Sequence, residues 1–297
     1  MALKNLKRTH RENNKTTQTG TRIRPSLPTF FALIFLLSVP LWVLGMTDLV
    51  ALPPNTPLYI PNLLWHVAIA LLPMIAALIL VYQEHGAQGV KQLLWRPFDA
   101  TRIKVKIWYV PIFLLFPSLM VLEYGLLHYI GVSLPNLPLP DMTVPVFFVL
   151  FFVLGIGEEL GWTGYALDPL QERWTALGSG LGLGIVWAVW HLVPLLEEPH
   201  TPMWIVWHLA HMLPLRVITV WLYNNTQSSM FAVVAFHASV NIGETVWPFY
   251  GTTGYYNPFV TSIFLIIVAT IVTILWGPQT LAHYRYARLR DSIEHQP

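Results

Sequence analysis

Residues 144–165, with the sequence VPVFFVLFFVLGIGEELGWTGY, decide the class of this protein because a long apolar run ends in two consecutive glutamates. The run is long enough to form a tilted helix across the roughly 30 Å hydrocarbon core of a membrane. Glu158 and Glu159 lie inside this predicted span. An ionisable side chain there costs about 2.5–3.5 kcal/mol or more on insertion scales, so both glutamates are candidate functional residues. The alternative is that they lie near the cytoplasmic end of the span and are simply in contact with water.

The rest of the chain repeats this apolar pattern. Of the 297 residues, 55% are hydrophobic and only 11% are charged, whereas an ordinary soluble domain has about 25% charged residues. This composition excludes a soluble globular enzyme. Further apolar runs of spanning length lie at 28–46, 61–82, 107–130, 177–196, 203–222, 229–247 and 258–276. The sequence therefore predicts an all-α polytopic membrane protein, a bundle of about eight transmembrane helices with a polar intramembrane cavity.

Basic residues are distributed asymmetrically along the chain. Seven of the 17 Lys and Arg residues precede the first apolar run, and nine more fall in segments predicted to lie on the same side of the membrane. The predicted outer loops carry acidic residues and no Lys or Arg. By the positive-inside rule, both termini are cytoplasmic and the protein is expected in the plasma membrane. Arg216, inside the sixth predicted span, is the basic residue that this partition leaves unexplained.

The predicted organisation has three parts. Residues 1–26 form a disordered basic cytoplasmic tail, residues 27–276 the membrane bundle, and residues 277–297 a second cytoplasmic tail. The basic tail suits an anionic lipid surface better than a nucleic acid, so membrane lipids are expected partners and nucleic acid is not. The chain has no Cys, which excludes thiol catalysis and Cys-ligated metal centres.

Polar residues are concentrated in the second half of the bundle. Consecutive helical residues diverge by about 100°, so one of Glu158 and Glu159 is expected at a reacting centre and the other at a supporting partner. His237 and Asn241 are four residues apart and share a helical face that Glu244 continues. Such donors stabilise an oxyanion or, alternatively, join helices by hydrogen bonds.

Two further histidine motifs carry weaker signals. His191 follows Trp187 by four residues in a Gly-rich run. A lone intramembrane His more often packs against other helices or hydrogen-bonds to them than acts in catalysis. His208 and His211 are three residues apart and form a candidate ligand pair, but the pair lacks a third metal ligand in the sequence pattern.

Three stretches together, GEELGWTGYALDPL, WAVWHLVPL and TVWLYNNTQSSMFAVVAFHASVN, resemble the CAAX-protease and bacteriocin-processing (CPBP) family of intramembrane glutamic proteases, which includes Ras-converting prenyl endopeptidases. The resemblance covers about 144–247 and implies a family-like catalytic core. It implies that Glu158 and His191 activate a water molecule, with Glu159 in support. His237 and Asn241 would form the oxyanion hole. The substrate implied is a membrane-associated peptide or prenylated protein, and neither a cofactor nor a metal is assigned.

Thr163 departs from the family pattern, because the first motif of the family usually has Arg at this position. A Thr hydroxyl cannot pair bidentately with a carboxylate, so another cation is required if Glu159 or an anionic substrate end is to be neutralised. Arg173 and Arg216 are the candidates. The departure leaves CAAX-type specificity open, and it also leaves an inactive family member open.

Several alternatives remain at this point. One is a non-proteolytic scaffold or bacteriocin-immunity-type protein with the same fold; a weaker one is a transporter, although no internal repeat is evident. Within the enzyme class, a zinc site would have to recruit His191 and His237 with a Glu carboxylate. Counting along straight helices spreads the site residues over about 10 Å and favours a cavity that opens towards the cytosol.

Overall fold

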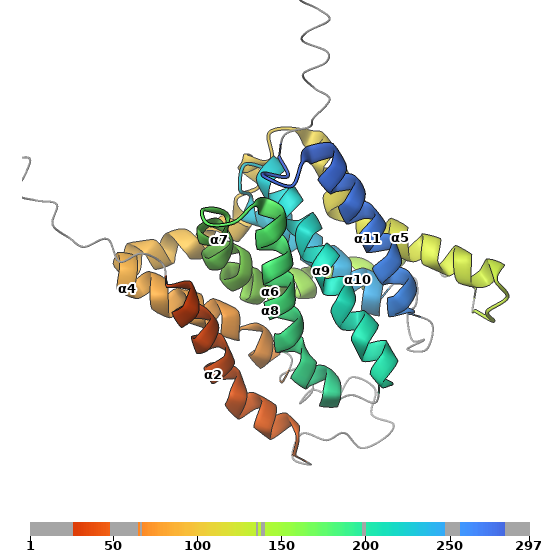
Figure 1. Ribbon diagram of the computed structural model, residues 1–297, viewed down its shortest axis with the longest axis horizontal. Coiled ribbons are helices and arrows are strands. Elements are labelled where there is room, and N and C mark those ends of the chain that lie inside the picture. The colour runs from red at the N-terminus through yellow and green to blue at the C-terminus, as the bar shows by residue number, and fades with distance from the viewer. Residues whose placement is uncertain are drawn as a thin grey trace, which may run out of the picture.

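The computed structural model describes residues 26–47, 65, 67–134, 136–137, 140–197, 200–246 and 256–282. Nearly all of the predicted tail at 1–26, most of the tail at 277–297 and the beginning of the second predicted span lie outside these residues. The described residues form helices and connecting segments, with no strand among them. The helices are α2 (Leu27–Gly45), α4 (Leu72–Trp95), α5 (Tyr109–Tyr129), α6 (Thr143–Gly161), α7 (Asp168–Gln171), α8 (Ala176–Glu197), α9 (Pro202–Asn225), α10 (Met230–Thr245) and α11 (Pro258–Trp276) (Figure 1).

Seven helical stretches within the described residues are long and apolar enough to cross a membrane, which confirms the all-α polytopic class. They are Leu27–Gly45, Val67–Phe98, Lys106–Tyr129, Thr143–Gln171, Ala176–Glu197, Pro202–Asn225 and Pro258–Trp276. The seventh predicted span, 229–247, corresponds to α10. This helix has 16 residues, or about 24 Å, which is shorter than the roughly 30 Å hydrocarbon core.

Helix α10 lies inside the bundle. It packs against α5, α6 and α9, and most of its side chains are buried, among them Phe236 and Val240. By contrast, α2 and α11 expose large apolar side chains such as Leu36 and Ile266. Helices with exposed apolar faces suit a lipid environment, whereas an enclosed helix is free to carry polar residues that face a cavity.

The described segments that the charge asymmetry assigns to the cytoplasm gather at one end of the bundle. Arg102, in the basic loop after α4, donates to the carbonyl oxygen of Gln227 after α9 at 3.0 Å. Asn224 at the end of α9 donates to the carbonyl oxygen of Thr280 after α11 at 2.7 Å. The amide of Ala176, the first residue of α8, donates to the carbonyl oxygen of Gln279 at 2.9 Å. Helix α10 therefore begins at the end where α9 and α11 finish.

The second span is longer than predicted. The sequence places its end at 82 and treats Lys91 and Arg96 as loop residues, but α4 continues to Trp95 and the short helix η1 (Arg96–Phe98) follows it. The helix is bent at Gly86, which has a φ of 63°. This left-handed backbone conformation favours glycine, and it lets the chain continue as helix in a new direction after the apolar segment.

The chain widens into a π-helix directly after the two glutamates. Helix α6 ends at Gly161, and the π-helix η4 (Trp162–Leu167) leads into α7. The side chain of Arg96 donates to the carbonyl oxygen of Gly164 at 3.0 Å and to the hydroxyl of Tyr223 at 2.8 Å. These contacts anchor the π-helix to α4 and α9. Single π turns inside helices are frequent at functional sites.

Candidate active site

One cavity of about 440 Å³ brings together all five predicted site residues. Its walls come from α6, α8, α9 and α10, and the residues that line it include Glu158, Glu159, His191, His237 and Asn241. Within this set, His237 lies 2.9 Å from Glu159 and 4.0 Å from Glu158. Glu158, His191, His237 and Asn241 thus border one common void.

The carboxylate of Glu159, in the wall of the cavity, is contacted by three polar side chains. It lies 2.8 Å from Nη1 of Arg216 on α9, accepts a hydrogen bond of 2.6 Å from the hydroxyl of Thr163, and lies 2.9 Å from Nδ1 of His237. The side chains of Glu159 and Arg216 are each 2% exposed. Hydrogen bonds that satisfy the remaining charge stabilise a buried ion pair, and here Thr163 and His237 contribute them on the carboxylate side. Nε and Nη2 of Arg216 are buried without a hydrogen-bond partner among the described residues.

Arg216 supplies the cation that Thr163 cannot. Of the two candidates named by the sequence, Arg173 is exposed after α7, whereas Arg216 is buried and bonded to Glu159. The guanidinium also lies over the ring of Trp187, 4.2 Å from its centroid. The positive charge of the first motif is thus present in this chain, but it comes from α9 instead of from the residue four positions after Glu159.

Glu158 has a different environment. Its Oε2 accepts a hydrogen bond of 2.8 Å from the indole nitrogen of Trp187 on α8. Its Oε1 lies 4.0 Å from Nε2 of His237, beyond hydrogen-bond distance. One oxygen is therefore held in place while the other is directed at a gap that a water molecule or substrate atom would fill. The two adjacent glutamates therefore have different contacts, as expected for neighbouring residues that diverge by about 100° on a helix.

The tautomer of His191 follows from its contact with the backbone of its own helix, α8. Nδ1 lies 3.0 Å from the carbonyl oxygen of Trp187. Since a carbonyl oxygen only accepts hydrogen bonds, Nδ1 must carry the proton, and Nε2 of the neutral ring is an acceptor. The rings of Trp187 and Trp190 pack edge-on against the imidazole and fix its orientation.

The imidazole of His237 lies between the carboxylates of Glu159 and Glu158. With Nδ1 bound to Glu159, Nε2 points towards Glu158, and it donates a hydrogen bond only when the ring is doubly protonated. Asn241, one turn later on α10, lines the same cavity. The sequence prediction of a shared donor face for these two residues agrees with this placement.

The cavity extends away from the end of the bundle that holds the basic segments. From the glutamates it continues past Leu195 near the end of α8 to His200, Trp204 and Tyr256. The charge asymmetry assigns this end to the outer side, whereas counting along straight helices favours a cavity that opens towards the cytosol. The direction of the cavity therefore differs from the one expected by counting. The counting gave the depth of each residue along its helix, but it gave no information on the empty space between the helices.

Several residues outside the predicted site contribute to it. Trp187 appears in the sequence only as part of a motif, yet it contacts both Glu158 and Arg216. Thr219 and Tyr256 also line the cavity and carry no signal in the sequence pattern. Glu123, by contrast, belongs to a separate contact: its carboxylate accepts hydrogen bonds from Thr261 and from the backbone amide of Asn257, and so joins α5 to α11.

Metal-ligand geometry is found at a different place from the one considered in the sequence. Among the described residues, the ligand atoms of His208, His211 and Glu244 lie within 4.8 Å of one another. The combination of His191, His237 and a glutamate is not among the groups that meet this distance. The pair His208 and His211 thus acquires the third candidate ligand that the sequence pattern lacks.

Comparisons with known proteins agree with the motifs. Residues 140–243 match the family model described as type II CAAX prenyl endopeptidase Rce1-like. CAAX prenyl protease 2 of Methanococcus maripaludis is 27% identical over 188 residues, covering 58% of this chain and 68% of the relative. The resemblance predicted from the three motifs is therefore confirmed, and the matched segment contains all five predicted site residues.

Proposed function

We propose that this chain, whose residues 140–243 are similar to the type II CAAX prenyl endopeptidases, is an intramembrane glutamic endopeptidase that cleaves a peptide bond of a prenylated or otherwise membrane-associated substrate. The observation that carries the proposal is the contrast between the two glutamates. Glu159 is neutralised by Arg216 and bound by two further donors. Glu158 is held through one oxygen by Trp187 and keeps the other directed into the cavity.

The reaction begins with a water molecule between Glu158 and the substrate. Glu158 takes a proton from this water while the water oxygen bonds to the carbonyl carbon of the scissile peptide bond. Nε2 of His191 accepts a hydrogen bond from the second hydrogen of the water, which stays on the oxygen, and this bond orients the nucleophile. Because Nδ1 of His191 donates its proton to the backbone of Trp187, Nε2 remains available to accept this hydrogen bond. No covalent acyl-enzyme is needed.

The negative charge that develops on the carbonyl oxygen is stabilised from α10. Asn241 donates from its side-chain amide, and His237 donates from Nε2 in its protonated form, which the carboxylate of Glu159 stabilises through Nδ1. When the carbon–nitrogen bond breaks, the proton held by Glu158 passes to the leaving amine. The products are a carboxylic acid and an amine, and Glu158 returns to its ionised form.

The decisive experiment is cleavage of a fluorogenic peptide that bears a prenylated cysteine near its C-terminus, by the full chain in lipid nanodiscs. Glu158→Gln keeps the size of the side chain and removes the base, so cleavage should fall below detection. The exposed Glu172 provides the matched control, and Glu172→Gln should retain wild-type cleavage. Cleavage by Glu158→Gln near the wild-type rate overturns the glutamic mechanism.

Two further measurements separate the alternatives. Chelation of divalent metal should leave cleavage intact, and activity restored only by zinc would favour the metal-dependent version. If wild type cleaves neither the prenylated peptide nor its unprenylated match, the scaffold or immunity-type interpretation takes precedence.

A further inference from the structure

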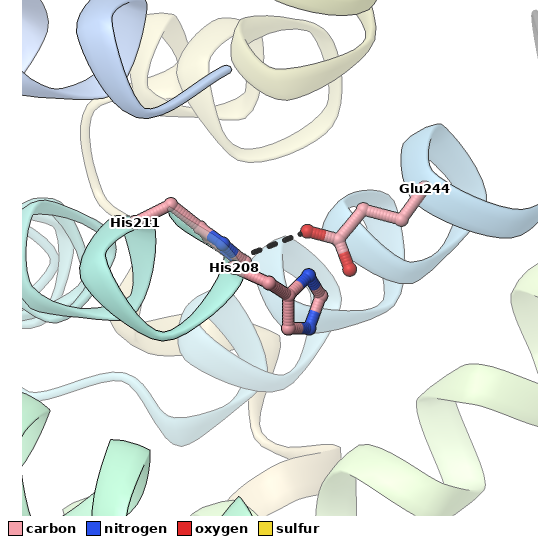
Figure 2. A group of neighbouring side chains, drawn as sticks. All are labelled: His208, His211 and Glu244. Carbon is pink, nitrogen blue, oxygen red and sulfur yellow. Dashed lines mark ion pairs between the residues drawn. The ribbon is translucent and has the colours of Figure 1, made fainter. Parts of the chain in front are cut away.

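His208, His211 and Glu244 form a second polar group in the cavity, apart from the proposed catalytic residues. His208 and His211 lie one turn apart on α9, and Glu244 lies near the end of α10. Figure 2 shows both imidazoles turned towards the carboxylate across the space between the two helices, with the ion pair of His211 and Glu244 dashed. In that pair Nε2 lies 3.1 Å from Oε1.

The distances suit a metal ion of ordinary size. The candidate ligand atoms of the three residues all lie within 4.8 Å of one another. A tetrahedral zinc ion with bonds of about 2.0–2.1 Å separates its ligand atoms by roughly 3.3–3.4 Å. The present separations therefore exceed those of a zinc site by at most about 1.4 Å, a difference on the scale of a side-chain rotation.

The surroundings of the group also resemble a metal site. Trp204 stacks on the ring of His208, with centroids 4.6 Å apart, and so fixes the orientation of that imidazole. Tyr256 donates a hydrogen bond of 3.4 Å to Oε1 of Glu244. Nδ1 of His211 is buried without a hydrogen-bond partner among the described residues, so the ring keeps an unsatisfied polar atom beside the cavity. Oriented imidazoles and hydrogen-bonded carboxylates are the usual supports of metal ligands.

We infer that His208, His211 and Glu244 bind a divalent transition-metal ion of the zinc class, with an open coordination position towards the cavity. Two imidazoles and one carboxylate are a ligand set that zinc sites with an open position use. All three residues line the cavity, so the remaining position is accessible to water or to an oxygen of a bound molecule. Two imidazoles favour zinc over magnesium, which prefers oxygen ligands.

The site is distinct from the hydrolytic group. Glu244 follows His237 by seven residues, which is roughly 10 Å along a helix. A metal ion bound there would therefore lie beyond the reach of Glu158, and it would join α9 to α10 across the cavity. Its presence does not depend on whether the protein cleaves peptides.

Zinc binding is measured by calorimetry on the full chain, purified with a histidine-free tag, in nanodiscs. Wild type should bind one Zn²⁺ per chain and no Mg²⁺ at the same concentration. Glu158→Gln should bind Zn²⁺ as wild type does, which separates this site from the proposed function. Exposed His85 supplies the control, and His85→Gln should leave binding unchanged. Co²⁺ should give the visible bands of a tetrahedral site, with no thiolate contribution because the chain lacks Cys.

His208→Gln is the most informative variant, because it leaves the ion pair of His211 and Glu244 intact. If the group is only an ion pair, His208→Gln has no effect on zinc affinity. If it is a metal site, His208→Gln, His211→Gln and Glu244→Gln should each abolish saturable binding while retaining wild-type helical content. Tyr256→Phe removes only a support and should weaken binding about 10-fold. Unchanged zinc binding in His208→Gln, or no saturable binding by wild type, overturns the inference.

Discussion

Nη1 of Arg216 on α9 lies 2.8 Å from the carboxylate of Glu159 on α6, and the hydroxyl of Thr163 binds the same carboxylate. An arginine at position 163 would lie one helical turn from Glu159, on the same helix face. The chain thus keeps a cation at Glu159 while changing the helix that contributes it. The ion pair gives the isolated Arg inside the sixth predicted span a partner, and Thr163 adds a hydrogen bond to the same carboxylate.

Loss of this cation should be costly. Arg216→Met leaves Glu159 buried with an uncompensated charge, so we expect a destabilisation of about 3–5 kcal/mol and a strong loss of cleavage. The apparent melting temperature in detergent and the cleavage rate in nanodiscs measure the two effects. A variant as stable as wild type would show that the ion pair has no role in the fold.

A second test asks whether a cation at position 163 can replace the cation at position 216. Thr163→Arg alone places two cations beside one buried carboxylate and should reduce both stability and cleavage. In the double variant Thr163→Arg with Arg216→Met, one cation remains, and both properties should recover relative to either single variant. The double-variant cycle gives the coupling between the two positions. Additive losses would contradict the idea that the two sites serve the same carboxylate.

Asn241 should affect the rate more than substrate binding. If its amide stabilises the oxyanion, Asn241→Ala should lower kcat by about 10²–10³-fold with little change in KM. Ser239 lies on the same helix, and its hydroxyl donates to the carbonyl oxygen of Ala235 within α10, so Ser239→Ala is the control that should retain activity. An increase in KM at unchanged kcat would assign Asn241 to substrate binding instead.

Close packing at Gly157 holds the helix that carries the glutamates. A Cβ at this position would lie 2.6 Å from the carbonyl oxygen of Ala70. Because a backbone oxygen cannot move aside, Gly157→Ala should destabilise the protein by about 1–3 kcal/mol. Gly125 has no atom near its would-be Cβ, and Gly125→Ala should be neutral or stabilising by about 0.5–1 kcal/mol. Equal melting temperatures for the two variants would refute this packing argument.

The path of α10 makes a prediction about topology. With seven long spans, both termini lie on one side of the membrane only if α10 also connects the two sides. Single cysteines at Ser26 and Thr280, introduced into the naturally Cys-free chain, should therefore react with a membrane-impermeant probe from the cytosolic side. Labelling of the two positions from opposite sides would mean that α10 does not complete a crossing.

The sequence alone determined the helical membrane class, most of the spans and five of the polar residues that line the cavity. Each of these depends on local information: apolar length sets the spans, and the cost of burying charge makes residues such as Glu158 candidates for function. The i, i+4 spacing of His237 and Asn241 was enough to place both on one face. Helix ends were less well predicted, because α4 continues beyond its apolar segment and α6 passes into a π-helix.

Only the tertiary structure decided which partners these residues have. Arg216 lies 57 residues from Glu159 in the chain, and either Arg173 or Arg216 was compatible with the sequence. Glu244 joins His208 and His211 only because α9 and α10 bring their side chains to the same part of the cavity. Pairings of this kind depend on the tilt and separation of helices. Those are set by packing between distant segments, such as the close approach at Gly157, and they leave no periodic signal in the sequence.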